Sequence, residues 1–157
     1  MLMRYIKTIK TYGTIENKNN AKKGDFIIKS FDYMEVSKPD EYKKDDNLYI
    51  LLEDAHDDEN GLISTYYIGS LNRMMMKVNL VFKRFSNDIS KIYNYDYRVL
   101  TENEKKSLYK AIEISSNNKY GKEYYLDIIN EEIGIDLREL EGYKNYLIQK
   151  NIKKYNL

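Results

Sequence analysis

The single histidine of the chain lies in a strongly acidic run, so this run is the first place to look for metal-dependent chemistry. His56 is the fourth residue of the sequence EDAHDDE at 53–59. Carboxylates and an imidazole can share a divalent cation. Their spacing here matches neither a calcium-binding loop nor a zinc motif. We therefore interpret the run as the solvated tip of a hairpin, and we expect no metal and no cofactor.

Nucleophilic catalysis also finds little material in this sequence. There is no cysteine and only one histidine, so the Ser-His-Asp and Cys-His arrangements lack a base or a nucleophile. The glycines form neither a phosphate-binding loop nor a dinucleotide-binding fingerprint. The lack of cysteine excludes disulfides and fits a reducing compartment. The residue types thus favour a protein without enzymatic activity.

A second group of chemically capable residues, at 72–98, combines cations with aromatic rings. The stretch 63–100 carries six basic and two acidic residues, a net charge of +4. Cations that follow phosphates and rings that stack on bases are what single-stranded nucleic-acid binding requires. The alternative is that the rings form the core and rim of a sheet with a merely soluble outer face. The residues that we single out as nucleic-acid ligands are Arg73, Lys77, Lys83, Arg84, Phe85, Lys91, Tyr95 and Arg98.

An acidic segment suggests a different kind of partner. Residues 25–62 carry four basic and twelve acidic residues, a net charge of −8. Such a segment could dock in the basic groove of a host nucleic-acid-binding protein, in competition with phosphate. Solvated loops that happen to be acidic would give the same pattern. The residues that we single out for this alternative are Asp45, Asp46, Asp57 and Asp58.

Three consecutive methionines stand at 74–76. Methionine is flexible and fills irregular gaps in hydrophobic cores, so we expect this run to be buried. If it were exposed, the same flexibility would suit contact with a partner.

The first hundred residues must position these groups, and their patterns predict a β-rich half. Alternating or short apolar runs predict strands at 25–36, 48–52, 62–70 and 77–85. The acidic run at 53–61 ends in Asn-Gly, a strong signal for a hairpin between its flanking strands. Four or five antiparallel strands of this length predict a small curled, SH3-like or barrel-like sheet.

The remainder, about 101–157, predicts three helices. Thr101 and Glu104 form a capping-box pattern at the start of the first helix. A second helix is expected at 122–132, ended by Gly134. A third is expected to be capped by Asp136 and to run to about Lys150. The last two could form a helix-turn-helix, but their balanced charge favours a helical layer on one face of the sheet.

Size and composition bound the remaining possibilities. With 157 residues, 42% of them hydrophobic, the chain suits a single domain, 1–157, with its own core. We expect neither a signal peptide nor a membrane span, hence a cytoplasmic protein that does not contact a membrane. The abundance of Asn, Lys, Ile and Tyr is typical of AT-rich codon usage, as in a low-GC bacterium or its phages. Nothing in the sequence indicates the oligomeric state.

Parts of residues 22–116 resemble the MazF/PemK family of ribonuclease toxins, which are small SH3-like barrels that cleave single-stranded RNA. The sequence KKGDFII at 22–28 is similar to the family's opening strand, and 48–52 and 62–70 resemble the next two. The segments LTENE at 100–104 and AIEIS at 111–115 resemble its final helix. The resemblance implies a barrel-like sheet.

The resemblance also implies catalytic residues, and here the sequence departs from the family. The family's catalytic arginine would fall near Asp46, where the chain has neither arginine nor proline. The family's threonine at the end of the next strand corresponds to Ser70. Arg73 and Arg84 are the arginines that could stabilise charge developing at a phosphorus atom without histidine chemistry.

Three hypotheses for function remain open at this point. The first is a non-enzymatic, regulatory nucleic-acid-binding protein of phage or mobile-element origin, with single-stranded nucleic acid favoured over duplex. The second is an inhibitor that binds a host protein complex through its acidic segment. The third is a MazF-like endoribonuclease.

Overall fold

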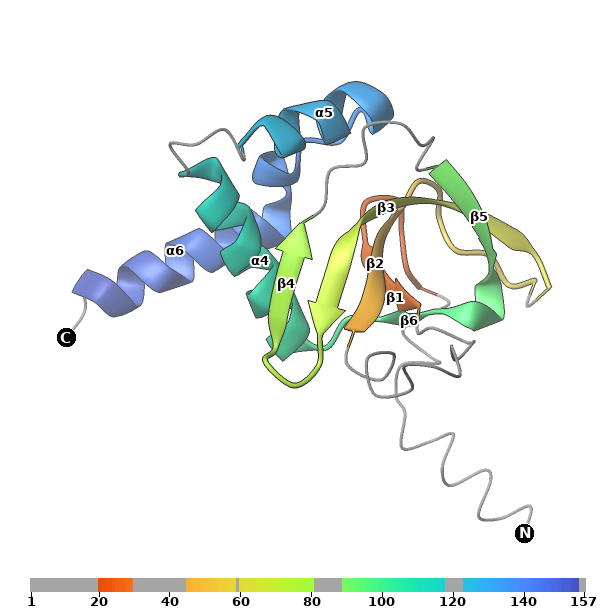
Figure 1. Ribbon diagram of the computed structural model, residues 1–157, viewed down its shortest axis with the longest axis horizontal. Coiled ribbons are helices and arrows are strands. Elements are labelled where there is room, and N and C mark those ends of the chain that lie inside the picture. Colours follow the sequence, from red (N-terminus) through yellow and green to blue (C-terminus); the bar gives the residue numbers. More distant parts are fainter. Residues whose placement is uncertain (1–19, 30–44, 59, 81–88, 118–122, 156–157) are drawn as a thin grey trace, which may run out of the picture.

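The computed structural model describes residues 20–29, 45–58, 60–80, 89–117 and 123–155. It confirms the α+β class, because an antiparallel sheet is followed by three C-terminal helices (Figure 1). No helix in these residues is long and apolar enough to cross a bilayer. The elements are β1 (Phe26–Lys29), β2 (Asp45–Leu51), β3 (Leu62–Asn72), β4 (Lys77–Leu80), β5 (Ile89–Tyr93), the 3-10 turn η1 (Asn94–Asp96), β6 (Arg98–Val99), α4 (Glu102–Ser116), α5 (Glu123–Ile133), the 3-10 turn η2 (Leu137–Glu139) and α6 (Glu141–Tyr155).

The long strand β3 organises the sheet. One edge pairs with β2, as the hairpin prediction requires, and the order continues through β1 to β6. The other edge is shared: Leu62–Tyr66 pairs with β5, and Gly69–Asn72 pairs with β4. The register between β2 and β3 shifts between Leu48 and Tyr49, which leaves Ile68 of β3 as an extra, bulged residue at the point where β3 changes partner. Bulges increase twist and bend strands, which is how one strand can serve two neighbours.

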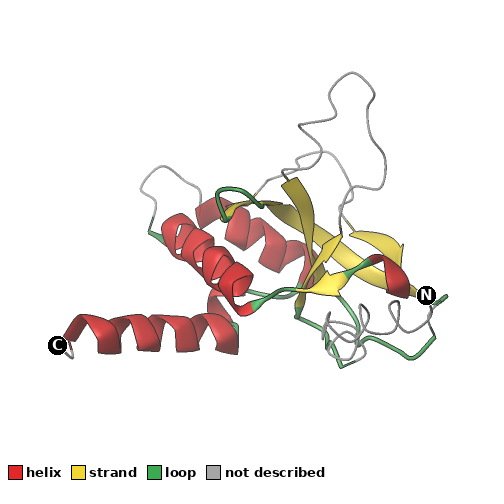
Figure 2. Ribbon diagram, turned by 90° about the horizontal axis from the view of Figure 1, so that it is seen from below, coloured by secondary structure: helices red, strands yellow, loops and turns green. Residues whose placement is uncertain are grey.

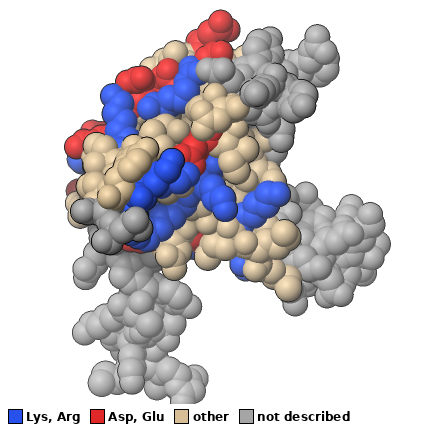
Figure 3. Space-filling model, turned by 90° about the vertical axis from the view of Figure 1, so that its left-hand side faces the viewer, with Lys and Arg blue, Asp and Glu red and all other residues tan. Residues whose placement is uncertain are grey.

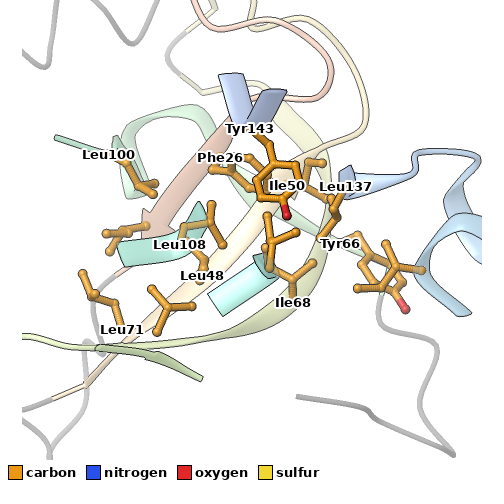
Figure 4. Close-up of a cluster of buried hydrophobic side chains, with 14 of the residues drawn as sticks. Phe26, Leu48, Ile50, Tyr66, Ile68, Leu71, Leu100, Leu108, Leu137 and Tyr143 are labelled. Carbon is orange, nitrogen blue, oxygen red and sulfur yellow. The ribbon is translucent and has the colours of Figure 1, made fainter. Parts of the chain in front are cut away.

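Two hydrophobic clusters lie on opposite faces of this curled sheet. The inner cluster is wrapped by β1, β2, β3, β5 and β6 and contains Ala21, Ile27, Leu51, Ile63, Ile92 and Tyr97. The larger outer cluster fills the space between the sheet and the helices (Figure 4). Because successive strand residues point to opposite faces, neighbours such as Ile27 and Ile28 contribute to different clusters. The sheet is therefore buried on both sides near its centre.

Helix α4 begins where the sequence predicts. The Thr101 hydroxyl accepts from the Glu104 backbone N–H, and the Glu104 carboxylate accepts from the Thr101 N–H at 2.8 Å, a complete capping box. Leu108 and Ile112 are fully buried against the sheet, as their spacing predicts. Among the described side chains of α5, Leu126 and Ile129 are buried.

The third predicted helix needs a correction. Asp136 caps the short turn η2 rather than a long helix, and its carboxylate accepts from the backbone N–H of Arg138. The helix α6 starts only at Glu141 and extends to Tyr155, beyond the expected end. Its first half packs on the outer cluster through Tyr143, Tyr146 and Leu147. Its second half extends away from the rest of the described structure (Figures 1 and 2).

Two strands were not expected from the sequence. Strands β5 and β6 are short, and they flank the turn η1. Strand β6 returns to pair with β1, which brings the end of the β-rich half next to its beginning. The parts of the predicted strands at 30–36 and 81–85 lie outside the described residues.

Candidate functional site

Arg73, a predicted nucleic-acid ligand, is bound to a carboxylate of the same chain. Its Nε donates to Asp46 Oδ2 at 2.7 Å, and its Nη2 donates to Oδ1 of the same side chain. These hydrogen bonds raise the pKa of the guanidinium. Asp46, a predicted protein-binding residue, is only 1% exposed. The pair therefore joins β2 to the end of β3, and Asp46 is not available to a partner.

Arg98 has a similar role on the same face of the sheet, close enough to the first pair for Arg98 and Asp46 to interact electrostatically. Its guanidinium donates to both carboxylate oxygens of Glu104, at 2.7 and 2.8 Å. Burial raises the pKa of the Glu104 carboxyl, but the hydrogen bonds from Arg98 and Thr101 outweigh burial and hold that pKa below its ordinary value. Glu104 thus serves the capping box and this ion pair together. Both arginines contribute to stability, because each neutralises a buried carboxylate.

The two predicted lysine ligands within the described residues do not share a face. Lys77 precedes Val78, whose side chain enters the outer cluster, so Lys77 points to the opposite face. Lys91 precedes Ile92, whose side chain enters the inner cluster, so Lys91 points to the face that carries the outer cluster. The basic residues at 72–98 therefore do not form one continuous surface in the described structure.

Tyr95 is exposed and stacks on Tyr93, with ring centroids 5.4 Å apart and an interplanar angle of 13°. Between them, Asn94 is buried and donates its amide to the backbone carbonyl of His56 at 2.6 Å. This contact ties the tyrosine pair to the acidic loop that contains Asp57 and Asp58.

The acidic loop itself remains at the surface. Asp57 and Asp58 are exposed, as the hairpin interpretation expects, and the Asp58 carboxylate accepts from the Asn60 N–H at 3.0 Å. Among the described residues, no three metal-ligating side chains come together. The side chain of Asp45 and the residues Lys83, Arg84 and Phe85 lie outside the described structure.

The methionines at 74–76 are exposed, which corrects the prediction that they are buried. Met74, Met75 and Met76 are 77%, 70% and 41% exposed. They form the tip of the β3–β4 hairpin, where the Asn72 side chain accepts from the Met75 N–H at 2.9 Å. Met76 has a φ of 48°, a left-handed conformation that is uncommon for a large side chain. The turn thus holds an apolar tip in solvent.

A groove lies between this hairpin and α4. It has a volume of about 290 Å³. Val78 and two methionines line one side, and Ala111 and Ile114 of α4 line the other. Ile114 is itself 53% exposed, although α4 buries its opposite face. The polar residues of the lining are Ser107, Lys77 and Lys110.

Lysines surround the groove without a counter-charge in the described chain. Lys77 and Lys110 make no ion pair with a described residue, and neither does Lys106, one turn before Lys110 on α4. Figure 3 shows this side of the molecule, with Lys and Arg spread across its middle and Asp and Glu mainly toward its upper part. The groove is therefore apolar inside and positive around its rim.

Of the groove residues, the sequence analysis had singled out Lys77 and the methionines. It missed Ser107, Lys110 and Ile114, because α4 was considered only for its buried face. A signal was present: Ile114 lies off the Leu108–Ile112 face, at a position where a soluble helix normally carries a polar residue.

Comparisons of the chain with protein-family models, with characterised proteins and with solved structures find no match.

Proposed function

We propose that this is a non-catalytic binding protein that holds a segment of a partner protein in the groove between the β3–β4 turn and α4. The observation that carries the proposal is the exposed apolar lining of this groove. Soluble proteins rarely expose contiguous apolar surface unless it contacts a partner. Methionines at such a surface adapt to the shape of what they bind.

The chemistry of the groove defines the partner segment. A volume of about 290 Å³ is at the small end of ligand pockets, so it suits one or two apolar side chains rather than a large cofactor. Lys110, with Lys106 one turn before it on α4, favours carboxylates beside those anchors. We therefore expect a segment in which Leu, Ile, Met or Phe is flanked by Asp or Glu.

The lining also indicates binding rather than catalysis. Its polar side-chain groups are the hydroxyl of Ser107 and the ammonium of Lys110, since the Lys77 side chain points to the other face of the sheet. No carboxylate or imidazole from the described residues lines the groove to act as a general base. The protein would then act by occupying its partner, in agreement with a regulator or an inhibitor, but through a basic apolar groove rather than through the acidic segment.

Selection from a random peptide library displayed on phage tests this proposal. We expect the enriched peptides to carry apolar anchors beside acidic residues. Met75→Asp and Lys110→Glu should each weaken their binding at least about tenfold, since both residues line the groove and neither is buried. Lys91→Glu, an equal charge change on β5, is the matched control. Enriched peptides without acidic residues, or peptides that bind all three variants as tightly as the wild type, would contradict the proposal.

Nucleic acid is the second candidate partner, favoured by the exposed, stacked Tyr93–Tyr95 pair with Lys91 on the same strand as Tyr93. Single strands are bound through stacking and through cations. Lys83 and Arg84 remain predicted ligands in this hypothesis.

Fluorescence anisotropy with labelled single-stranded RNA, single-stranded DNA and duplex DNA decides this second candidate. The nucleic-acid hypothesis requires binding that weakens steeply as the salt concentration rises. It also requires that binding is lost in Tyr95→Ala and in the double variant Lys83→Glu, Arg84→Glu. Cleaved RNA in the same samples would support the MazF-like alternative, and intact RNA would end it. The absence of binding to all three probes would remove nucleic acid as a partner.

A further inference from the structure

Strand β4 forms an edge of the sheet. It pairs with β3 on one side, and no described strand pairs with its other side (Figure 1). A Cβ added at Gly69 of β3 would collide with the carbonyl oxygen of Asn79, so this carbonyl points toward β3. Successive residues of an edge strand direct their backbone groups alternately toward and away from the paired strand. The N–H and C=O groups of Val78 and Leu80 therefore point to the outer edge, where no described residue bonds to them.

This outer edge lies beside the proposed groove. Val78 lines the groove, and its side chain enters the outer cluster together with Leu108 and Ile112 of α4. Ala111 and Ile114 continue the surface of α4 along the groove, but no described strand continues the sheet beneath them. Ile114 is 53% exposed for this reason. An additional strand beside β4 would point every second side chain to this face, and so into the groove.

We propose that the partner segment binds in the groove as an extended strand that adds to the outer edge of β4. The inference rests on the groove function proposed above and specifies the backbone conformation of the partner. When a strand adds to an exposed edge, main-chain hydrogen bonds give affinity and pockets for alternate side chains give specificity. Val78 and Leu80 each offer one N–H donor and one C=O acceptor to such a segment. A helical segment would leave these groups unpaired, because its own backbone groups bond to one another.

The two faces of β4 define the sequence of this segment. Partner residues opposite Val78 and Leu80 share their face, which carries the outer cluster, and are therefore apolar. The residue opposite Lys77 points to the other face, where a carboxylate meets the exposed ammonium group. An antiparallel segment then reads apolar, polar, apolar and acidic, and a parallel segment reads in the reverse order. Lys110, on the groove itself, favours a further carboxylate beside the apolar anchors.

Amide hydrogen exchange of the protein measures pairing at the edge directly. With a selected peptide at saturating concentration, exchange at the N–H groups of Val78 and Leu80 should slow at least about tenfold. The N–H of Asn79 is the matched control on the same strand, because it already faces β3 and should change much less. If exchange at Val78 and Leu80 is unchanged while the peptide is bound, the segment does not add to β4.

A backbone N-methyl scan of the same peptide tests the inference from the partner's side. Each peptide residue is replaced in turn by its N-methyl form, which removes one N–H donor and keeps the side chain. Methylation of the residues whose N–H faces β4, the two apolar anchors among them, should weaken binding at least about tenfold. The residues between them are the controls, since their N–H groups point away from β4. Losses that do not alternate along the peptide, as a helical segment would give, would overturn strand addition.

The groove variants keep the two proposals apart. If Met75→Asp and Lys110→Glu weaken binding of the unmodified peptide but N-methylation shows no alternation, the groove function stands and strand addition is wrong. If the selection enriches no peptide, both proposals are wrong.

Discussion

At the scale of single residues, two of the arginines predicted to bind nucleic acid, Arg73 and Arg98, are engaged with buried carboxylates. Arg98 shows the consequence most clearly, because Glu104 is almost fully buried beneath it. Removal of the arginine would leave that carboxylate unpaired. We expect Arg98→Ala to lower the free energy of unfolding by about 2–4 kcal/mol, measured by urea denaturation. Glu104→Gln, which keeps a hydrogen-bonding cap, should cost less, about 1 kcal/mol. An Arg98→Ala protein as stable as the wild type would show that the pair contributes nothing.

The same ion pair predicts a dependence of stability on pH. The pKa of Glu104 lies below its ordinary value of 4.5 in the folded protein. The unfolded chain therefore takes up this proton first as the pH falls, so the stabilisation is complete above pH 4.5 and is lost as the pH drops through the folded-state pKa. In urea titrations at several pH values, Glu104→Gln should lose less stability over this window than the wild type. If both proteins lose the same amount of stability over this pH range, Glu104 is not the source of the pH dependence.

Some of these residue contacts could be predicted from the sequence and others could not. The capping box depends only on the spacing of Thr101 and Glu104, so local sequence was sufficient. The Arg98–Glu104 pair joins residues only six apart, but it depends on how the chain turns between β6 and α4, which neither the strand nor the helix pattern specifies. The methionines were wrongly expected in the core, because an apolar run in a four-residue turn looks the same as one in a buried strand.

At the scale of elements, the position of the methionine turn depends on how closely β4 approaches β3. A Cβ added at Gly69 would lie 2.0 Å from the carbonyl oxygen of Asn79. Gly69→Ala must therefore push the two strands apart, and we expect a loss of at least about 2 kcal/mol of stability together with weaker peptide binding in the groove. Gly134→Ala is the control, since its Cβ would meet no atom within 4 Å.

The Gly134→Ala variant should lose only about 1 kcal/mol, from its left-handed backbone, with peptide binding unchanged. Urea denaturation and anisotropy of both variants make the comparison. If the Gly69→Ala protein binds the peptide as tightly as the wild type does, peptide binding in the groove does not depend on the close pairing of β3 and β4.

The sequence indicated the elements whose residues show a clear hydrophobic pattern, and it missed β5 and β6 for a physical reason. Strand β3 and the three helices have enough residues for their periodicity to be visible. Strands β5 and β6 are five and two residues long, and they are fixed by pairing with β3 and β1 rather than by their own pattern. The sequence predicted a curled sheet, but without β6 it could not show which strand pairs with the free edge of β1.

At the scale of the whole molecule, the positive charge beside the groove does not come only from the basic segment 63–100 of the sequence. Lys106 and Lys110, which lie beside the groove, belong to a helical half whose net charge is zero. The fold thus places two cations of this balanced half beside the exposed apolar residues of the β3–β4 hairpin. The proposed binding function rests on this combination of an apolar groove and nearby positive charge.

A charge-swap cycle on the groove tests the central claim most directly. The affinity of a selected acidic peptide would be measured for the wild type and for Lys110→Glu, and then repeated with the peptide's acidic residues changed to lysine. If the groove binds through charge complementarity, Lys110→Glu weakens binding of the acidic peptide at least about tenfold and improves binding of the basic one. Affinities that change independently of one another, or a Lys110→Glu protein that still prefers the acidic peptide to the same degree, would contradict the account.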